Sequence, residues 1–143
     1  MEEIKIKVPI YYTQYFKTKK DKNSLVGLNW FRSANYVINN EVKKHYHELV
    51  YSQVLSKYHK VRLKGKVHVH YDVFVKNNKT DGPNVRSVVE KYVLDGLVHA
   101  GVIEEDNVTI LVSDSSKYAI DTNDPRVEIT ITSCLEKETQ PDF

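Results

Sequence analysis

Alternating apolar and polar positions predict most of the strands of this chain. Residues 2–10, 66–76 and 126–133 alternate in this way, and a shorter apolar stretch covers 108–113. Successive side chains of a strand point to opposite faces, so each alternating segment has one apolar and one polar face. The pattern therefore predicts four strands, half-buried on one side.

Two further segments carry apolar residues at helical spacing. The first runs from a cap at Asn39 or Asn40 to about Tyr58, and the second runs from Pro83 to a stop at Gly101. Proline suits the first turn of a helix because that turn leaves its N–H groups unpaired, and glycine suits the left-handed residue after the last turn. Both segments are predicted to pack their apolar stripes on the sheet.

The remaining segments are predicted to be irregular. Residues 11–32 follow no period and are predicted to form a long loop, and polar loops are predicted at 77–82 and between 113 and 126. Residues 136–143 form a polar tail. The predicted order β-α-β-α-β-β indicates a single mixed α+β domain of 143 residues.

Composition excludes several classes of protein. No apolar run reaches the roughly 20 residues of a membrane-spanning helix, and the N-terminus lacks the pattern of a signal peptide, so a cytoplasmic location is expected. Cys134 is the only cysteine, which excludes an intrachain disulfide and a cysteine-ligated zinc or iron–sulfur centre. Glycine-rich phosphate loops and the esterase Gly-x-Ser-x-Gly motif are absent, so no nucleotide cofactor is expected.

Charge divides the chain into two unlike halves. Residues 1–80 contain 16 Lys and Arg against 6 Asp and Glu, whereas residues 81–143 contain 5 against 13, so a net charge of +2 combines +10 with −8. A polyanion needs cations to hold it, and a divalent metal needs oxygen ligands. The division indicates a phosphate-binding surface beside a carboxylate-rich site, although ordinary surface charge explains it as well.

The basic loop offers two interpretations. Between Tyr11 and Lys22 it mixes aromatic rings with lysines, as nucleic-acid-binding segments do when rings stack on bases and ammonium groups meet phosphates. Tyrosine-rich loops also cover hydrophobic cores. The sequence leaves both interpretations open.

An acidic segment brackets the second helix and supplies candidate ligands for a hard cation: Asp81, Asn84, Asp95, Glu105 and Asp106. About 28 Å of helix separates Asp81 from Ala100, but residues 101–106, if extended, could run back about 20 Å. Asp106 would then approach Asp81 or Asp95, within one chain or across a dimer. The alternative is that Asp81 starts the helix, Asp95 pairs with Lys91, and residues 104–106 form a solvated turn.

Three polar residues share one face of the strand at 66–76. His68, His70 and Asp72 offer imidazole and carboxylate groups, which suit a transition metal. A half-buried strand also needs a polar outer face, which explains the same residues without a metal. The segment His45-Tyr46-His47-Glu48 lacks the spacing of the zinc-protease motif, which excludes that class.

Several of these residues together resemble a known family. Leu28-Asn29-Trp30 precedes the first helix, and the acidic segment reads Leu94-Asp95-Gly96-Leu97, then Ala100-Gly101-Val102-Ile103, then Glu105-Asp106. From about Leu28 to Val112 the chain resembles the RusA family of phage-type Holliday-junction resolvases. It departs from the family's Asp-x-Asp-Asn, reading Asp81-Gly82-Pro83-Asn84, and Lys91 follows Asn84 by seven residues, where the family has about three.

The resemblance implies a homodimeric, magnesium-dependent endonuclease that nicks four-way DNA junctions symmetrically, with manganese as an alternative ion. In a phage-encoded protein its location would be the bacterial cytoplasm. The implied metal ligands are Asp81 and Asp106, with Asn84 and Asp95 or Glu90 completing the set. Glu105 stands at the first of the family's paired acids. Lys91 would contact a phosphate or the leaving group, and a metal-bound water would attack the phosphodiester.

Basic residues of the first half would hold the DNA. The candidate DNA-binding residues are Lys17, Lys19, Lys20, Asn29, Lys43, Lys44 and Lys76. One alternative is a branched-DNA or RNA binding module that has lost the metal site with the second aspartate. Another is an interaction protein on the same fold, which would not prefer junctions to duplex DNA.

Overall fold

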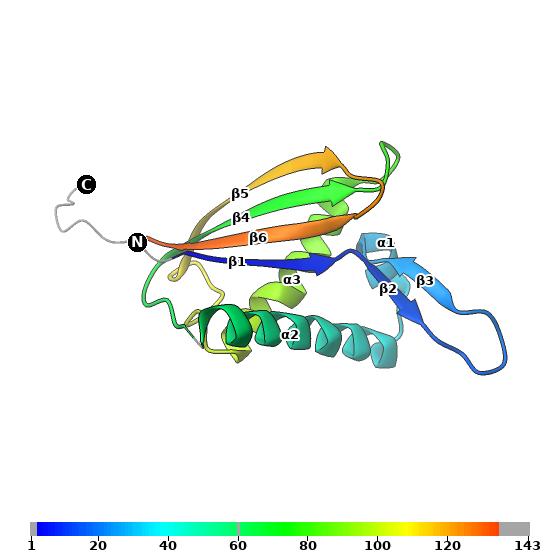
Figure 1. The fold of residues 1–143 in the computed structure, drawn as a ribbon, viewed down its shortest axis with the longest axis horizontal. Coiled ribbons are helices and arrows are strands. Elements are labelled where there is room, and N and C mark those ends of the chain that lie inside the picture. The colour runs from blue at the N-terminus through cyan, green and yellow to red at the C-terminus, as the bar shows by residue number, and fades with distance from the viewer. Residues whose placement is uncertain (1–2, 60, 135–143) are drawn as a thin grey trace.

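A four-stranded mixed sheet with two long helices on one of its faces forms the core of the molecule (Figure 1). The computed structural model describes residues 3–59 and 61–134. The sheet has the order β1-β6-β4-β5, in which only the β4–β5 pair is parallel. Its strands are β1 (Glu3–Pro9), β4 (Val67–Val75), β5 (Leu111–Ile120) and β6 (Arg126–Ser133).

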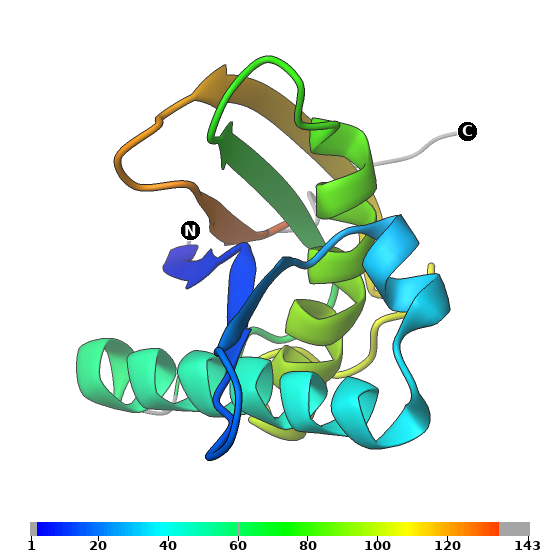
Figure 2. The same cartoon turned by 90° about the vertical axis from the view of Figure 1, so that its right-hand side faces the viewer.

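The two long helices are α2 (Tyr36–Tyr58) and α3 (Gly82–His99), and they cross each other beneath the sheet (Figure 2). Alternate residues of β1, β4 and β6 are buried against them, and those of β4 and β6 follow the predicted alternation throughout. The apolar stripes of both helices complete the core. The predicted α+β class is therefore confirmed.

The stretch predicted to be one long loop contains three elements, so that prediction was wrong. A hairpin of β2 (Tyr11–Gln14) and β3 (Lys22–Leu25) is followed by the short helix α1 (Leu28–Ser33). Two strands of four residues, each half-exposed or more, give no clear alternation. The hairpin also lacks a short glycine turn that would mark it in the sequence.

Two predicted boundaries were also wrong. Helix α2 begins one turn early, because the Asn35 side chain accepts a hydrogen bond from the Ile38 N–H at 2.9 Å and caps it in place of Asn39 or Asn40. Strand β5 begins at Leu111 and continues through the polar segment to Ile120. It is an edge strand that is mostly exposed, so its polar residues resemble a loop in the sequence.

Both predicted ends of α3 are confirmed. Asp81 caps its first turn, with Pro83 following inside the helix. Gly101 has φ +77°, and the N–H groups of Gly101 and Val102 donate to the carbonyls of Val98 and Leu97. This pair of bonds is a Schellman motif, which requires a left-handed residue at Gly101.

A Gly101→Ala substitution is expected to lower the free energy of unfolding by about 1 kcal/mol, because a Cβ atom is disfavoured at this φ. Chemical denaturation would measure the change. Gly27→Ala is the matched control, since Gly27 has φ −127° and its added Cβ would meet only Val85, at 3.9 Å. Equal losses in both variants would contradict the role given to the left-handed conformation.

Three further sequence predictions concern membrane-spanning helices, the cysteine and the polar tail. Within the described residues, none of the helices combines the length and apolar character needed to cross a membrane. Cys134 is a free, half-buried cysteine directly after β6. The polar tail predicted at 136–143 lies outside the described residues.

Candidate functional site

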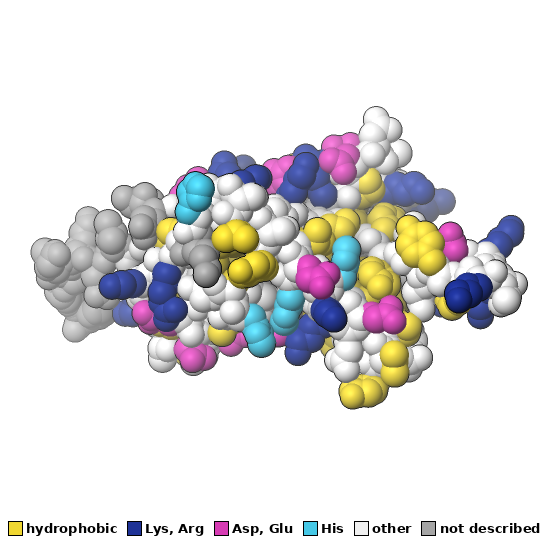
Figure 3. Space-filling view, turned by 60° about the horizontal axis from the view of Figure 1, so that its bottom comes forward, with side chains coloured by type: hydrophobic (Ala, Val, Ile, Leu, Met, Phe, Trp, Pro, Cys, Tyr) yellow, Lys and Arg dark blue, Asp and Glu magenta, His cyan; other side chains and the backbone are white. Residues whose placement is uncertain are grey.

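A cationic hollow lies between the β2–β3 hairpin, α1 and the start of α2. Its volume is about 410 Å³. Three lysines and two aromatic rings contribute to its wall, and its described lining contains no acidic side chain. These five residues are Phe16, Lys19, Lys20, Lys22 and Trp30. The corresponding end of the molecule, on the right of Figure 3, shows lysines and apolar side chains together, with acidic side chains next to them.

The hairpin contains residues suited to each of the two interpretations that the sequence left open. Tyr11 and Tyr12 are half-buried and pack against the core. Beyond them, the Lys19 Nζ atom lies 4.5 Å from the centre of the Phe16 ring, beside the hollow. Ammonium groups and exposed ring faces are the groups that hold phosphates and stack on bases. The tip of the hairpin is therefore a candidate nucleic-acid surface.

The other predicted DNA-binding residues are spread over several elements. Lys17 is exposed near the hairpin tip, and Asn29 is exposed on α1. Lys44 is exposed on α2, and Lys76 is exposed directly after β4. Lys43 pairs with Asp95 at 3.5 Å. Of the seven predicted residues, only Lys19 and Lys20 line the cationic hollow.

Replacing both Lys19 and Lys20 with alanine is expected to weaken DNA binding at least tenfold at low salt. The slope of log K against log salt should also fall by about 2, because each lysine on a phosphate releases roughly one counterion. A filter-binding or anisotropy titration at several salt concentrations measures both effects. The double variant Lys57→Ala, Lys64→Ala removes the same charge elsewhere, and an equal loss in it would assign the effect to net charge.

The acidic segment is divided between the two ends of α3. At the N-terminal end, the Asp81 carboxylate accepts hydrogen bonds from the Asn84 backbone N–H at 3.3 Å and from its Nδ2 at 2.8 Å. Glu105 and Asp106 are exposed beyond the other end. The 18 residues of α3 span about 27 Å. Of the alternatives that the sequence left open, an approach of Asp106 to Asp81 within one chain is therefore not found in the structure.

Packing of the residues after α3 explains this separation. Val102 and Ile103 are buried, and the Val102 carbonyl accepts a hydrogen bond from the Leu63 N–H at 2.7 Å. The Ile110 carbonyl then accepts from the N–H of Val67, the first residue of β4, at 2.8 Å. Residues 101–110 therefore pass the end of the sheet at which β4 begins, and they do not return along α3.

Two residues considered as replacements for the missing aspartate have other partners. Glu90 pairs with Arg86 at 3.2 Å, and burial raises the pKa of its carboxyl group. The sequence alternative paired Asp95 with Lys91. In the structure Asp95 instead pairs with His47 and Lys43 of α2. The Lys91 Nζ atom lies 5.9 Å from the centre of the Phe31 ring.

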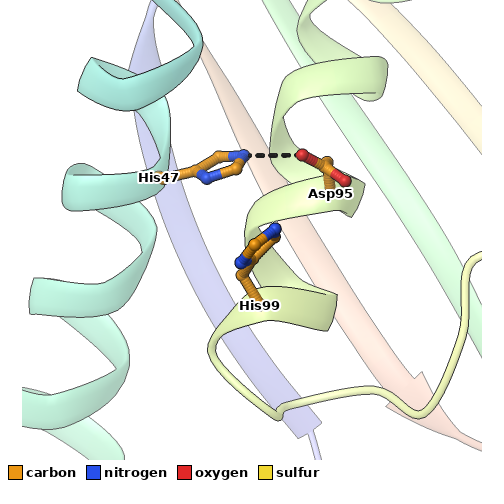
Figure 4. A group of neighbouring side chains, drawn as sticks. All are labelled: His47, Asp95 and His99. Atoms are coloured by element: carbon orange, nitrogen blue, oxygen red, sulfur yellow. Dashed lines mark ion pairs between the residues drawn. The ribbon is translucent and has the colours of Figure 1, made fainter.

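A group of His47, Asp95 and His99 joins α2 to α3 (Figure 4). The His47 Nε2 and Asp95 Oδ2 atoms are 2.9 Å apart, and the two imidazole rings have centres 5.0 Å apart. Burial lowers the pKa of His47, and the opposing effect of Asp95 is smaller. Sequence reasoning missed this group, although the spacing of Asp95 and His99 places them on one face of α3.

Gly96 lets the two helices meet at this point. A Cβ atom on Gly96 would lie 3.3 Å from His47 Cδ2 and 3.5 Å from its Cα atom. Figure 3 shows histidine and acidic side chains next to each other on this face of the molecule. A hollow of about 270 Å³ adjoins the group and is lined by both of its histidines.

The histidines of β4 form a hydrogen-bonded polar face. Both ring nitrogens of His68 lie close to hydroxyl groups, those of Ser113 at 2.6 Å and Ser115 at 3.1 Å. His70 contacts Ser115 at 2.6 Å and Asp72 at 3.0 Å. Every ring nitrogen therefore already has a partner, which supports the interpretation of this surface as a solvated strand face.

A scan of the chain against protein-family models finds no match, and neither does a search of curated proteins.

Proposed function

We propose that this protein is a magnesium-dependent endonuclease that binds and nicks branched DNA as a homodimer. The observation that carries the proposal is the cationic hollow, which combines three lysines with the half-buried rings of Phe16 and Trp30 and has no acidic side chain in its described lining. Duplex DNA keeps its bases stacked away from such rings, whereas the stacking of bases is interrupted at the branch point of a junction. The hollow therefore favours branched over uniform duplex DNA.

The dimer is supported by the free edge of β5. Within the described chain, β5 pairs with β4 on one side and with no strand on the other. An edge of ten residues exposes a row of backbone hydrogen-bonding groups. Three apolar residues of this strand are also exposed by 44–57%: Val112, Tyr118 and Ile120. An isologous pairing of two β5 strands would cover both the backbone groups and these side chains.

Such a pairing would also bring the separated acids together. Asp81 lies at the C-terminal end of β5, where Gly82 and Tyr118 line one hollow, and Asp106 precedes the N-terminal end. Two β5 strands related by a two-fold axis run antiparallel. Asp81 of one chain therefore comes to the end that carries Asp106 of the second copy.

The oxygen donors at these positions fit a hard cation. Asp81 and Asn84 are held together by their hydrogen bonds, and Asp106 is exposed, so carboxylate and amide oxygens would hold the ion. Magnesium bound there would supply Lewis acidity at the scissile phosphodiester. The protein's own part is to present these oxygens and to hold the DNA phosphates with the hairpin lysines.

The test is incubation of the protein with a labelled four-way junction or a matched duplex, with magnesium or with a chelator. Paired symmetric nicks that occur only on the junction and only with magnesium are expected on a denaturing gel. A gel shift in the presence of chelator measures binding separately. Absence of both binding and nicks would refute the proposal, and equal binding to duplex and junction would favour an interaction protein.

Binding without cleavage is the second candidate function. It is favoured by the Asp81 carboxylate, which is already engaged by the two nitrogens of Asn84, and by asparagine at position 84, where the RusA family has the last residue of Asp-x-Asp-Asn but this chain lacks the second aspartate before it. A tight junction shift without nicks, in magnesium and in manganese, would establish this function in place of the nuclease.

A further inference from the structure

We propose that His47, Asp95 and His99 form a binding site for a transition-metal dication of the zinc class, which ties α2 to α3. One ligand atom from each residue lies within 4.8 Å of the others (Figure 4). The site is separate from the acids at the two ends of α3. It does not depend on the proposed nuclease function.

The donor set selects the class of metal. Two imidazole nitrogens and one carboxylate oxygen suit zinc and its neighbours, whereas magnesium prefers oxygen alone. Tetrahedral zinc, with ligand atoms about 2.0–2.1 Å away, spaces those atoms roughly 3.3 Å apart. The His47 and Asp95 atoms, which are 2.9 Å apart, must separate slightly, and the His99 atom must come closer to them. His99 can make this movement, because it is exposed and is the last residue of α3.

Two atoms of the group are buried without a hydrogen bond. His47 Nε2 and Asp95 Oδ2 are shielded from solvent, and although they are 2.9 Å apart they are not aligned as donor and acceptor. Their ion pair lacks an aligned hydrogen bond, so part of the cost of burying the two atoms is not repaid. A cation coordinated by both atoms would remove this cost. The histidines of β4 differ in this respect, because all their ring nitrogens have partners.

The surrounding structure holds the site and leaves it accessible. His47 is fixed by the close helix crossing at Gly96, and Asp95 lies on the same rigid helix as His99. The adjoining hollow of about 270 Å³ gives room for a water molecule as a fourth ligand. Three protein ligands with one open position are a common arrangement for zinc.

The effect of replacing Lys43 distinguishes a metal site from a simple ion pair. Its ammonium group lies 3.5 Å from Asp95 Oδ2, with the side chain 47% exposed. In the metal-free protein it supplies positive charge to Asp95, and it must move away when a dication binds. Removing this charge should therefore strengthen metal binding, whereas removal of a ligand should weaken it.

The experiment is a titration of the metal-free, full-length protein with Zn²⁺ in competition with a chromogenic chelator, without DNA. One equivalent is expected to bind. His99→Gln should weaken the affinity at least tenfold, Lys43→Gln should strengthen it severalfold, and millimolar Mg²⁺ should not compete. The matched control is His68→Gln, which should stay within twofold of the unaltered protein. Because His99 is exposed, its variant is expected to fold.

Three results would overturn the proposal: no zinc binding by the unaltered protein, equal affinity in His99→Gln, or a loss confined to His68→Gln. Visible absorption of Co²⁺ bound in place of zinc gives a second measurement. Tetrahedral bands should appear with the unaltered protein and disappear with His99→Gln. Since no DNA is present, failure of junction cleavage leaves this result unaffected, and the reverse also holds.

Discussion

Asp81→Asn and Asp106→Asn proteins should each lose at least about a hundredfold in junction nicking, because each lacks a carboxylate that the proposed magnesium site needs. An equimolar mixture of the two, unfolded and refolded together, should recover about a quarter of the original nicking rate. Half of its dimers are mixed, and one of the two sites in each mixed dimer has both carboxylates. Single-turnover nicking of a labelled junction measures this recovery.

The choice of asparagine separates chemistry from folding. Asp81 also caps α3, and asparagine caps helices about as well as aspartate does, so the thermal midpoint should change little. Junction binding in chelator should remain. Glu48→Gln, an exposed change on α2, is the control and should keep its nicking rate. No recovery in the mixture would contradict a site shared between two chains, and full activity of Asp81→Asn would remove Asp81 from the site.

The parts of the fold that sequence could predict are those with one buried face. Strands β4 and β6 and the C-terminal end of α3 bury every second residue or one stripe, and burial forces a visible period on the sequence. Strand β5 is different. Its backbone pairs with β4, but its side chains are mostly in solvent, so no period is imposed on Ser113 to Ser116. Pairing of the backbone leaves no mark on such a strand.

The candidate sites show the same limit at longer range. The alternative that Asp81 starts α3 depends on capping, which is a local interaction, and the structure confirms this cap. The position of Asp106 depends on where Val102 packs and on which strand residues 101–110 approach, and neither is a local property. Similarly, His47 is 48 residues from Asp95 in the chain. Only the crossing of α2 over α3 at Gly96 brings the two together.

Ile129→Ala is expected to lower the free energy of unfolding by about 3–4 kcal/mol, the loss typical of a buried aliphatic side chain that leaves a cavity. Ile129 lies on the inner strand β6, in register with Ile6 of β1 and Tyr71 of β4. All three are 2% exposed or less. The neighbouring strands are held by hydrogen bonds on both sides of β6 and cannot close over the cavity.

Thr130→Ala on the same strand provides the control. Thr130 is half-exposed on the opposite, polar face of β6, opposite Lys5 and His70, so its replacement should cost no more than about 0.5 kcal/mol. Urea denaturation of both variants measures the difference. Similar losses would mean that the polar face is covered, for example by a partner or a second copy. A threonine side chain contributes as much to the free energy of unfolding as a core residue only when it is buried. The two-layer fold requires a large loss at Ile129 and a small one at Thr130.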